Sequence, residues 1–157
     1  MQLDRFAMRI SLGYADRASE LEVMARTDPA PFEHIRPTLS VAQLQLLIEI
    51  VRTVAVGDPV REYVADVVEA TRRHRDLRLG VSTRGTLILL AVARAYALAN
   101  GRGYITPDDI KTLCEPVLAH RVAVTAEAEI DGIGAGDVLR QILDEVEVPR
   151  TRAARTG

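Results

Sequence analysis

The chain has 157 residues, 48% of them apolar, which is enough for one domain with a hydrophobic core and room for a further fragment. Its formal net charge of −2 excludes the strongly basic surface that is typical of nucleic-acid-binding domains. A single cysteine, Cys114, excludes an internal disulfide. No secretory signal opens the sequence, and its apolar runs are far shorter than the ~20 residues that span a bilayer. We therefore expect a cytoplasmic protein with neither nucleic acid nor a membrane as partner.

Residues 1–15 are predicted to contain a β-strand, because Phe6, Met8 and Ile10 alternate with smaller or polar residues. A lone strand cannot pair its own backbone. We expect this segment to be disordered, paired with another copy of the chain, or folded back on the helices that follow. Residues 16–57 are predicted to form a short helix, a proline-punctuated loop and a second helix that Ser40 caps.

Residues 58–148 are predicted to form a small helical bundle, so the expected fold class is mainly α. After Asp58-Pro59, apolar side chains recur at helical spacing and make an inner face of Val60, Tyr63, Val64, Val67, Val68 and Thr71. The charged run over residues 72–78 is interpreted as a solvated helix end. Residues 83–99 are apolar nearly all round, which predicts a central helix that packs on several sides.

The rest of the bundle is punctuated by caps and turns. Thr106-Pro107 is expected to open a helix whose first turn holds the acids Asp108 and Asp109 in structural roles. Pro116 is expected to end or kink that helix, because proline lacks an amide donor and clashes with the preceding turn. A short strand is predicted within residues 122–130, and a glycine-rich turn then leads to a last helix. Residues 149–157 are predicted to be a disordered tail.

Arg84 is the first candidate site residue, because it lies in the first turn of an otherwise apolar helix. A cation at a helix N-terminus is disfavoured by roughly 0.3–1 kcal/mol, whereas an anion is favoured there. An arginine beside such a site makes physical sense if a phosphate comes to lie between them. The alternative is that Arg84 simply points into solvent, and the residues alone leave both possibilities open.

Several motifs resemble, in the same order, the lid domain of MoxR-type AAA+ ATPases, which are related to the magnesium-chelatase group. The stretch Gly80-Val81-Ser82-Thr83-Arg84-Gly85 is similar to that family's second-sensor motif, although Thr83 stands where proline is usual. The other matching stretches are residues 62–72, 101–109, 116–121 and 138–150. Gln2-Leu3-Asp4-Arg5-Phe6 with Gly13-Tyr14 resembles the last strand of the ATPase core.

The resemblance implies roles for individual residues. Arg84 would be a sensor-2 arginine that reaches the γ-phosphate of ATP in its own subunit, with Ser82 and Thr83 beside the nucleotide. Arg5 would be an arginine finger that enters the neighbouring subunit's site. For Arg5, a solvent-facing arginine at a strand start is the equal alternative. His120 and Arg121 would contact the core or another subunit, or else form a polar helix end.

The resemblance also defines what the chain does not contain. A P-loop needs a lysine in a G-x-x-x-x-G-K-[ST] motif, but Lys111 is the only lysine and follows Ile110 within a predicted helix. A Walker B strand ending in paired acids is absent too. We therefore expect a C-terminal fragment that does not hydrolyse ATP alone, and we interpret Met1 as an artificial or mis-assigned start.

In the parent protein the family implies ATP and Mg²⁺ in the core, a hexameric ring and chaperone-like work in maturing metal cofactors. A von Willebrand factor A-domain protein is the implied partner. The fragment alone is expected to bind no cofactor, and its scattered histidines and single cysteine predict no metal site. The alternative is a stand-alone helical interaction or regulatory module. A helix-turn-helix DNA binder is disfavoured, because the helix at Arg84 lacks the polar face that reads bases.

Overall fold

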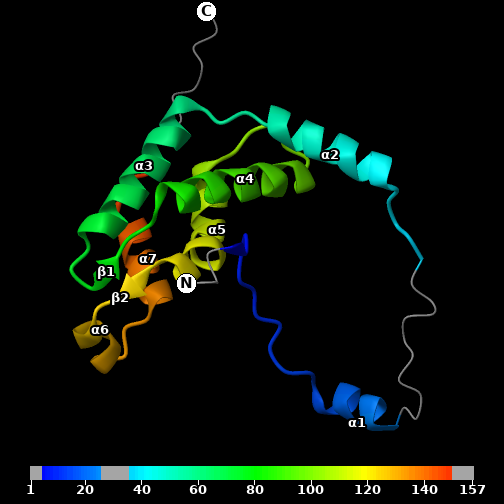
Figure 1. Cartoon of the computed structure of the whole chain (residues 1–157), viewed down its shortest axis with the longest axis horizontal. Coiled ribbons are helices and arrows are strands. Elements are labelled where there is room, and N and C mark those ends of the chain that lie inside the picture. The colour runs from blue at the N-terminus through cyan, green and yellow to red at the C-terminus, as the bar shows by residue number, and fades with distance from the viewer. Residues whose placement is uncertain (1–4, 26–35, 150–157) are drawn as a thin grey trace, which may run out of the picture.

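The computed structural model describes residues 5–25 and 36–149. This part of the chain is mainly helical, as predicted, with a small two-stranded sheet (Figure 1). The predicted tail, residues 149–157, lies outside the described residues except for Pro149. In chain order the elements are α1 (Arg17–Ala25), α2 (Val41–Thr53), α3 (Asp58–Arg73), β1 (Leu77–Leu79), α4 (Thr83–Ala99), α5 (Pro107–Leu118), the 3₁₀ turn η3 (Ala119–Arg121), β2 (Ala123–Val124), α6 (Ala126–Ile130) and α7 (Ala135–Glu145).

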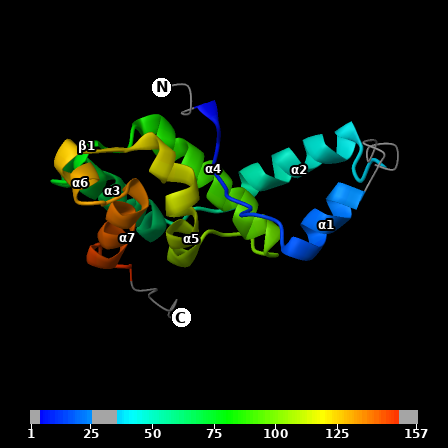
Figure 2. The same cartoon turned by 90° about the horizontal axis from the view of Figure 1, so that it is seen from below.

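Helix α3 forms one wall of the bundle. All six residues of its predicted inner face are buried, from Val60 to Thr71, so the 3.6-residue period was sufficient to identify this face. The N-cap is Gly57, and Pro59 lies in the first turn. The buried side of α3 contacts α5 and α7 (Figure 2), and the core extends from these helices to the buried residues of α4.

Helix α4 has the predicted bounds but is less enclosed than its composition suggests. Its buried residues are Gly85, Leu89, Ala93 and Ala97, a single stripe at four-residue spacing. Leu87 on another side is 63% exposed. The helix packs mainly on α5 and, to a lesser degree, on α2, and side chains beside the stripe are partly buried against the core: Ile88, Leu90, Val92 and Leu98. The prediction of a helix that packs on several sides is therefore confirmed in part, because the side that carries Leu87 meets solvent.

Helix α5 begins as predicted and ends later. Thr106 and Asp109 form a capping box, and Arg102 makes a two-pronged ion pair with Asp109 at 2.6 Å for each N···O contact. Pro116 does not end the helix, which continues to Leu118 before tightening into η3. Because a proline within the last turn of a helix costs only one hydrogen bond, burial of Val117 and Leu118 is enough to keep the helical path.

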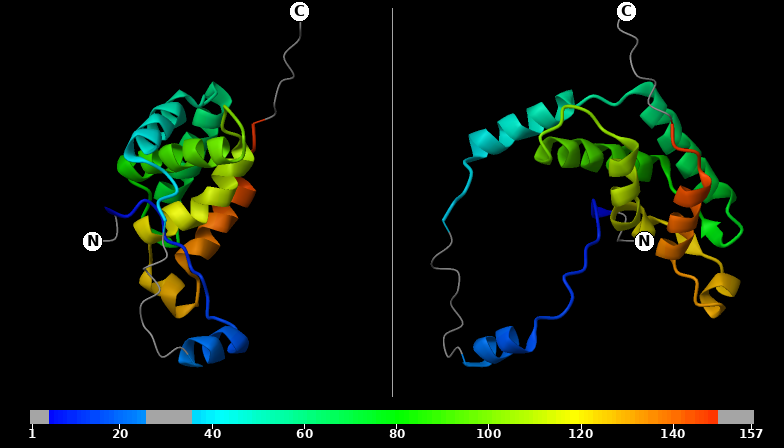
Figure 3. Two further views of the ribbon diagram at one scale, coloured as in Figure 1. Left: turned by 90° about the vertical axis from the view of Figure 1, so that its right-hand side faces the viewer. Right: turned by 180° about the vertical axis from the view of Figure 1, so that it is seen from behind.

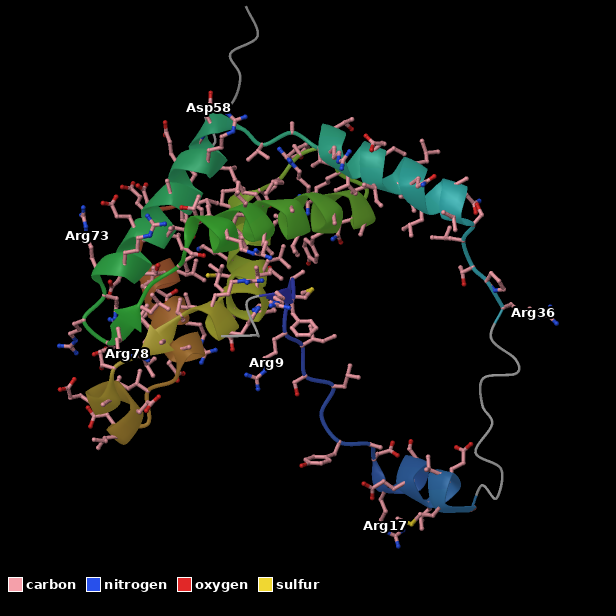
Figure 4. All side chains as sticks on the ribbon, viewed as in Figure 1. Arg9, Arg17, Arg36, Asp58, Arg73 and Arg78 are labelled. Atoms are coloured by element: carbon pink, nitrogen blue, oxygen red, sulfur yellow. The ribbon has the colours of Figure 1, made fainter. Side chains whose placement is uncertain are left out.

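The charged run at residues 72–78 is not simply a helix end. Helix α3 stops at Arg73, and the chain then forms β1, which pairs antiparallel with β2. The strand expected within residues 122–130 is present but only two residues long, and the segment continues as α6. Figure 4 shows Arg73 and Arg78 at this end of the molecule, with the Arg73 side chain directed away from the bundle.

The N-terminal segment forms no strand over residues 5–16, contrary to the prediction. A strand needs a neighbouring strand to pair its backbone, and no other strand of the described chain lies beside it. One of the three expected arrangements is observed instead, because the segment folds back and the Arg9 amide donates to the Pro116 carbonyl at 2.8 Å. Beyond Arg9 it leads away from the bundle to α1, whose residues are all exposed (Figure 3).

Helix α2 is attached at its C-terminal end. Ser40 caps it through a capping box, as predicted. Its chain then continues into a bridge in which the Ala55 amide donates to the Gly103 carbonyl at 2.8 Å and the Ile105 amide donates to the Ala55 carbonyl at 3.1 Å. The apolar stripe of α2 itself remains exposed, with Leu44 at 52% and Ile48 at 46%.

Candidate functional site

The loop before α4 is fixed to the last turn of α3. The Val81 amide donates to Thr71 Oγ1 at 3.0 Å, and Arg72 Nε donates to the Val81 carbonyl at 2.9 Å. At Gly80 a β-carbon would lie 2.7 Å from both Arg72 Cα and the Thr71 carbonyl oxygen, so only glycine allows this approach. The start of α4 is thereby held against α3 by two side chain–backbone hydrogen bonds and by the close approach at Gly80, none of which sequence patterns revealed.

Ser82 is the N-cap of α4. Its Oγ accepts a hydrogen bond from the Gly85 amide at 3.2 Å, and its carbonyl accepts one from Thr86 Oγ1 at 3.3 Å. Thr83 and Arg84 follow as the first two helical residues, and both are exposed. The structure therefore places the three predicted residues together at one helix N-terminus, with the Ser82 hydroxyl engaged in capping.

An open groove runs beside this helix start, between α3 and α4. Its lining is mixed, with apolar side chains from both helices and the polar residues Glu69, Arg72, Arg73, Thr83 and Thr86. Within it, Arg73 forms an ion pair with Glu69. Arg72 is already engaged through Nε with the Val81 carbonyl, which leaves its outer guanidinium nitrogens at the groove.

Arg121 lies on the other side of the α4 start. A β-carbon built at Gly85 would be 3.3 Å from Arg121 Cδ and 3.0 Å from Val81 Cγ1. The Arg121 side chain is only 5% exposed, and its Nε donates to the Val117 carbonyl at 2.9 Å. The interpretation of residues 120–121 as a polar helix end is therefore wrong, because both side chains are buried.

His120 and Arg121 hold the N-terminal segment. Arg121 Nη2 donates to the Phe6 carbonyl and, at 3.3 Å, to the Ala7 carbonyl. His120 Nε2 lies 3.2 Å from the same Phe6 carbonyl oxygen, which makes Nε2 the protonated ring nitrogen. Arg5 is exposed and directly precedes the carbonyl that these two side chains bind. We call His120, Arg121 and the carbonyl groups of Phe6 and Ala7 the Phe6 clamp.

The described residues, 5–25 and 36–149, contain neither a candidate metal site nor an accessible thiol. No group of three or more histidine, cysteine, aspartate or glutamate side chains in them is arranged to hold a metal ion. Cys114 is fully buried, and desolvation raises the pKa of its thiol to about 12, so it stays protonated in the folded chain. Every helix in these ranges is also too short or too polar to cross a lipid bilayer.

Comparison with known proteins identifies the family. The family model described as the AAA lid domain matches residues 69–142, which include Arg84 and Arg121. Over nearly the whole chain, the chaperone MoxR1 of Mycobacterium tuberculosis is 33% identical across 161 residues, a match that covers 97% of this chain and 42% of MoxR1. The chain belongs to the MoxR-like AAA+ proteins.

Two further similarities cover the same extent of this MoxR-like chain. The protein YeaC of Bacillus subtilis is 37% identical over 154 residues, covering 98% of the chain and 48% of YeaC. A solved structure of a protein assigned as an ATPase, from Cytophaga hutchinsonii, superposes with a TM-score of 0.83 at 32% identity, covering 95% of this chain and 48% of that one. The chain thus spans about half the length of the relatives it matches, and it contains the lid.

In this MoxR-like chain, the structure brings the predicted site residues to two places. Ser82, Thr83 and Arg84 share the N-terminus of α4. Arg5 lies at the other place, beside the Phe6 clamp. Sequence reasoning missed Thr71, Arg72 and the clamp. The signal for Thr71 was its position as the only polar residue on the inner face of α3, whereas the clamp joins residues more than a hundred positions apart.

Proposed function

We propose that this lid senses the γ-phosphate of ATP through Arg84 and couples hydrolysis to motion of a MoxR-like ATPase ring. The observation that carries the proposal is the fixed, exposed position of Arg84 in the first turn of α4. The loop before it is bound to α3 through Thr71, Arg72 and Val81, so the arginine is presented by a rigid support. A guanidinium placed in this way can neutralise charge on phosphoryl oxygens.

The chemistry of the γ-phosphate would be supplied by an ATPase core that holds ATP and Mg²⁺. Lys111 lies within α5 and cannot act as the P-loop lysine, so the lid contributes charge stabilisation and position and no phosphate cradle of its own. When the γ-phosphate is present, Arg84 would draw the lid toward the core. After hydrolysis this attraction is lost, which makes lid position depend on the nucleotide.

The remaining parts of the proposal follow the family. We place the lid at residues 58–148 and the linking helices at 16–57. Arg5 would act in trans on the nucleotide of the neighbouring subunit in a hexameric ring. Chaperone-like work in metal-cofactor maturation, with a von Willebrand factor A-domain partner, is the expected setting in the cytoplasm.

The test joins this chain to the nucleotide-binding core of the complete protein and replaces Arg84 by alanine. We expect ATP turnover to fall by about 10²-fold, the usual effect of removing one donor to developing charge. The preference for ATP over ADP in nucleotide binding should fall as well. Arg61→Ala is the matched control, because Arg61 is an exposed arginine near the opposite end of α3. Unchanged turnover in Arg84→Ala would refute the sensor role and favour a helical interaction module.

A further inference from the structure

Arg121 is the side chain that physically connects the two candidate arginines. On one side its Cδ packs against the first turn of α4, where Gly85 follows Arg84. On the other side its Nη2 binds the carbonyl oxygens of Phe6 and Ala7, directly after Arg5. The buried Arg121 side chain therefore lies between the start of α4 and the N-terminal segment.

The contacts of Arg121 are rigid. The guanidinium is a planar fork, and its donors reach the carbonyls of Val117, Phe6 and Ala7. Because the side chain is 5% exposed, any displacement that broke these hydrogen bonds would leave a charge buried without compensation. Gly85 leaves room for this side chain, since a β-carbon there would lie 3.3 Å from Arg121 Cδ.

His120 restricts the same carbonyl from a second direction. Its ring is 8% exposed, and Nε2 approaches the Phe6 oxygen at 3.2 Å, so this one oxygen uses both lone pairs on buried side chains. The Arg9 amide adds a further bond to the Pro116 carbonyl at 2.8 Å. The backbone from Phe6 to Arg9 is thereby held in one orientation relative to α5 and η3.

We propose that Arg121 is a positioning residue that couples Arg84 to Arg5. Through it, the nucleotide that Arg84 senses in one subunit determines the position in which that subunit presents Arg5 to its neighbour. A shift of the α4 first turn must move Arg121, because the two are in contact through Gly85. Movement of Arg121 must move Phe6, and with it the residue that precedes it. This coupling rests on the proposed roles of Arg84 and Arg5, and it assigns the Phe6 clamp a task beyond stability.

The first test measures the clamp in this chain. Cysteines introduced at Met8 and Leu87, both exposed, can carry spin labels, since the buried Cys114 does not react. The unaltered clamp should give one narrow distance distribution. Arg121→Met should broaden it, whereas Arg140→Met, which removes an exposed arginine of α7, should leave it narrow. A narrow distribution in Arg121→Met would overturn the proposal.

The second test separates the coupling from the roles on which it rests. In the complete ATPase, Arg5→Ala subunits are mixed with subunits whose Walker B acid is replaced by its amide, which still bind ATP but do not hydrolyse it. Turnover then requires Arg5 from the second kind of subunit. Recovery of turnover supports the trans role of Arg5, and no recovery refutes it. When the subunits that donate Arg5 also carry Arg121→Lys, we expect them to restore at most a tenth of that turnover.

Arg102→Lys in the Arg5-donating subunits is the control for a general loss of lid stability. Arg102 stabilises α5 through Asp109 without contacting residues 5–9. Full recovery with Arg121→Lys subunits would refute the coupling while leaving the proposed function intact. Equal losses with Arg102→Lys and Arg121→Lys would also refute it, because loss of lid stability would then explain both.

Discussion

Replacement of Gly80 by alanine tests whether the loop before α4 depends on its approach to α3. The new β-carbon would lie 2.7 Å from Arg72 Cα and from the Thr71 carbonyl oxygen, and 2.8 Å from the Arg72 amide nitrogen. These are backbone atoms of a helix, so they cannot rotate away as a side chain can. The loop must therefore move off α3.

The cost can be worked out from the contacts that this movement breaks. One is the neutral bond from the Val81 amide to Thr71 Oγ1, and the other is the charged bond from Arg72 Nε to the Val81 carbonyl. Such bonds contribute about 0.5–1.5 and 1.5–3 kcal/mol respectively. Gly80→Ala should therefore lower the free energy of unfolding by about 2–4.5 kcal/mol, and the thermal midpoint by about 4–18 °C.

Urea unfolding followed by far-ultraviolet circular dichroism measures this change. Gly103→Ala is the matched control, because a β-carbon there meets no atom within 4 Å and its backbone is not in the left-handed region. That variant should be neutral or more stable by up to about 1 kcal/mol, since alanine has less freedom in the unfolded chain. If the two variants differed by less than about 0.5 kcal/mol, the argument from close approach at Gly80 would be wrong.

Two further predictions concern titratable groups. Burial raises the pKa of Asp109, but hydrogen bonds from Arg102 and Thr106 outweigh burial and hold it below its ordinary value of 3.8. The stability that this carboxylate contributes is therefore present above its pKa in the unfolded chain and is lost as the pH falls through its pKa in the folded chain. In urea titrations at a series of pH values, Asp109→Asn should therefore reduce the loss of stability on the acid side. It should also cost about 1.5–3 kcal/mol at pH 7, whereas Asp108→Asn should cost less than half of that; equal effects would contradict the assigned pairing. The Cys114 thiol, with its pKa raised to about 12 by burial, should react with a disulfide reagent only at the rate of unfolding, and fast labelling of the folded chain would show that α5 is not packed as described.

The sequence identified what local patterns determine. The inner face of α3, the bounds of α4 and the caps at Ser40 and Thr106 all follow from spacing and from hydrogen bonds within four residues. What escaped prediction depends on contacts between distant segments. Strands β1 and β2 are too short to give a periodic sequence signal. The helix continues past Pro116 because the residues after it are buried.

The candidate site divides in the same way. Motif resemblance was enough to select Ser82, Thr83 and Arg84, because they are consecutive and begin a helix. It gave residues 120–121 only a general contact role. Their partner, the Phe6 carbonyl, is 115 positions from Arg121 in sequence, and a backbone oxygen has no residue identity that a motif could report.

The open N-terminal segment has a consequence for handling the chain in solution. Ile10, Leu12 and Tyr14 are 68%, 92% and 100% exposed, along a stretch whose backbone amides and carbonyls have no neighbouring strand. Such a stretch is a template for strand addition between molecules, and charged residues along it act as gatekeepers against aggregation. Between Phe6 and Ala15 the only charged residue is Arg9, whose side chain extends away from the bundle in Figure 4. We therefore predict that a neutral residue at position 9 increases self-association of the isolated chain in concentrated samples.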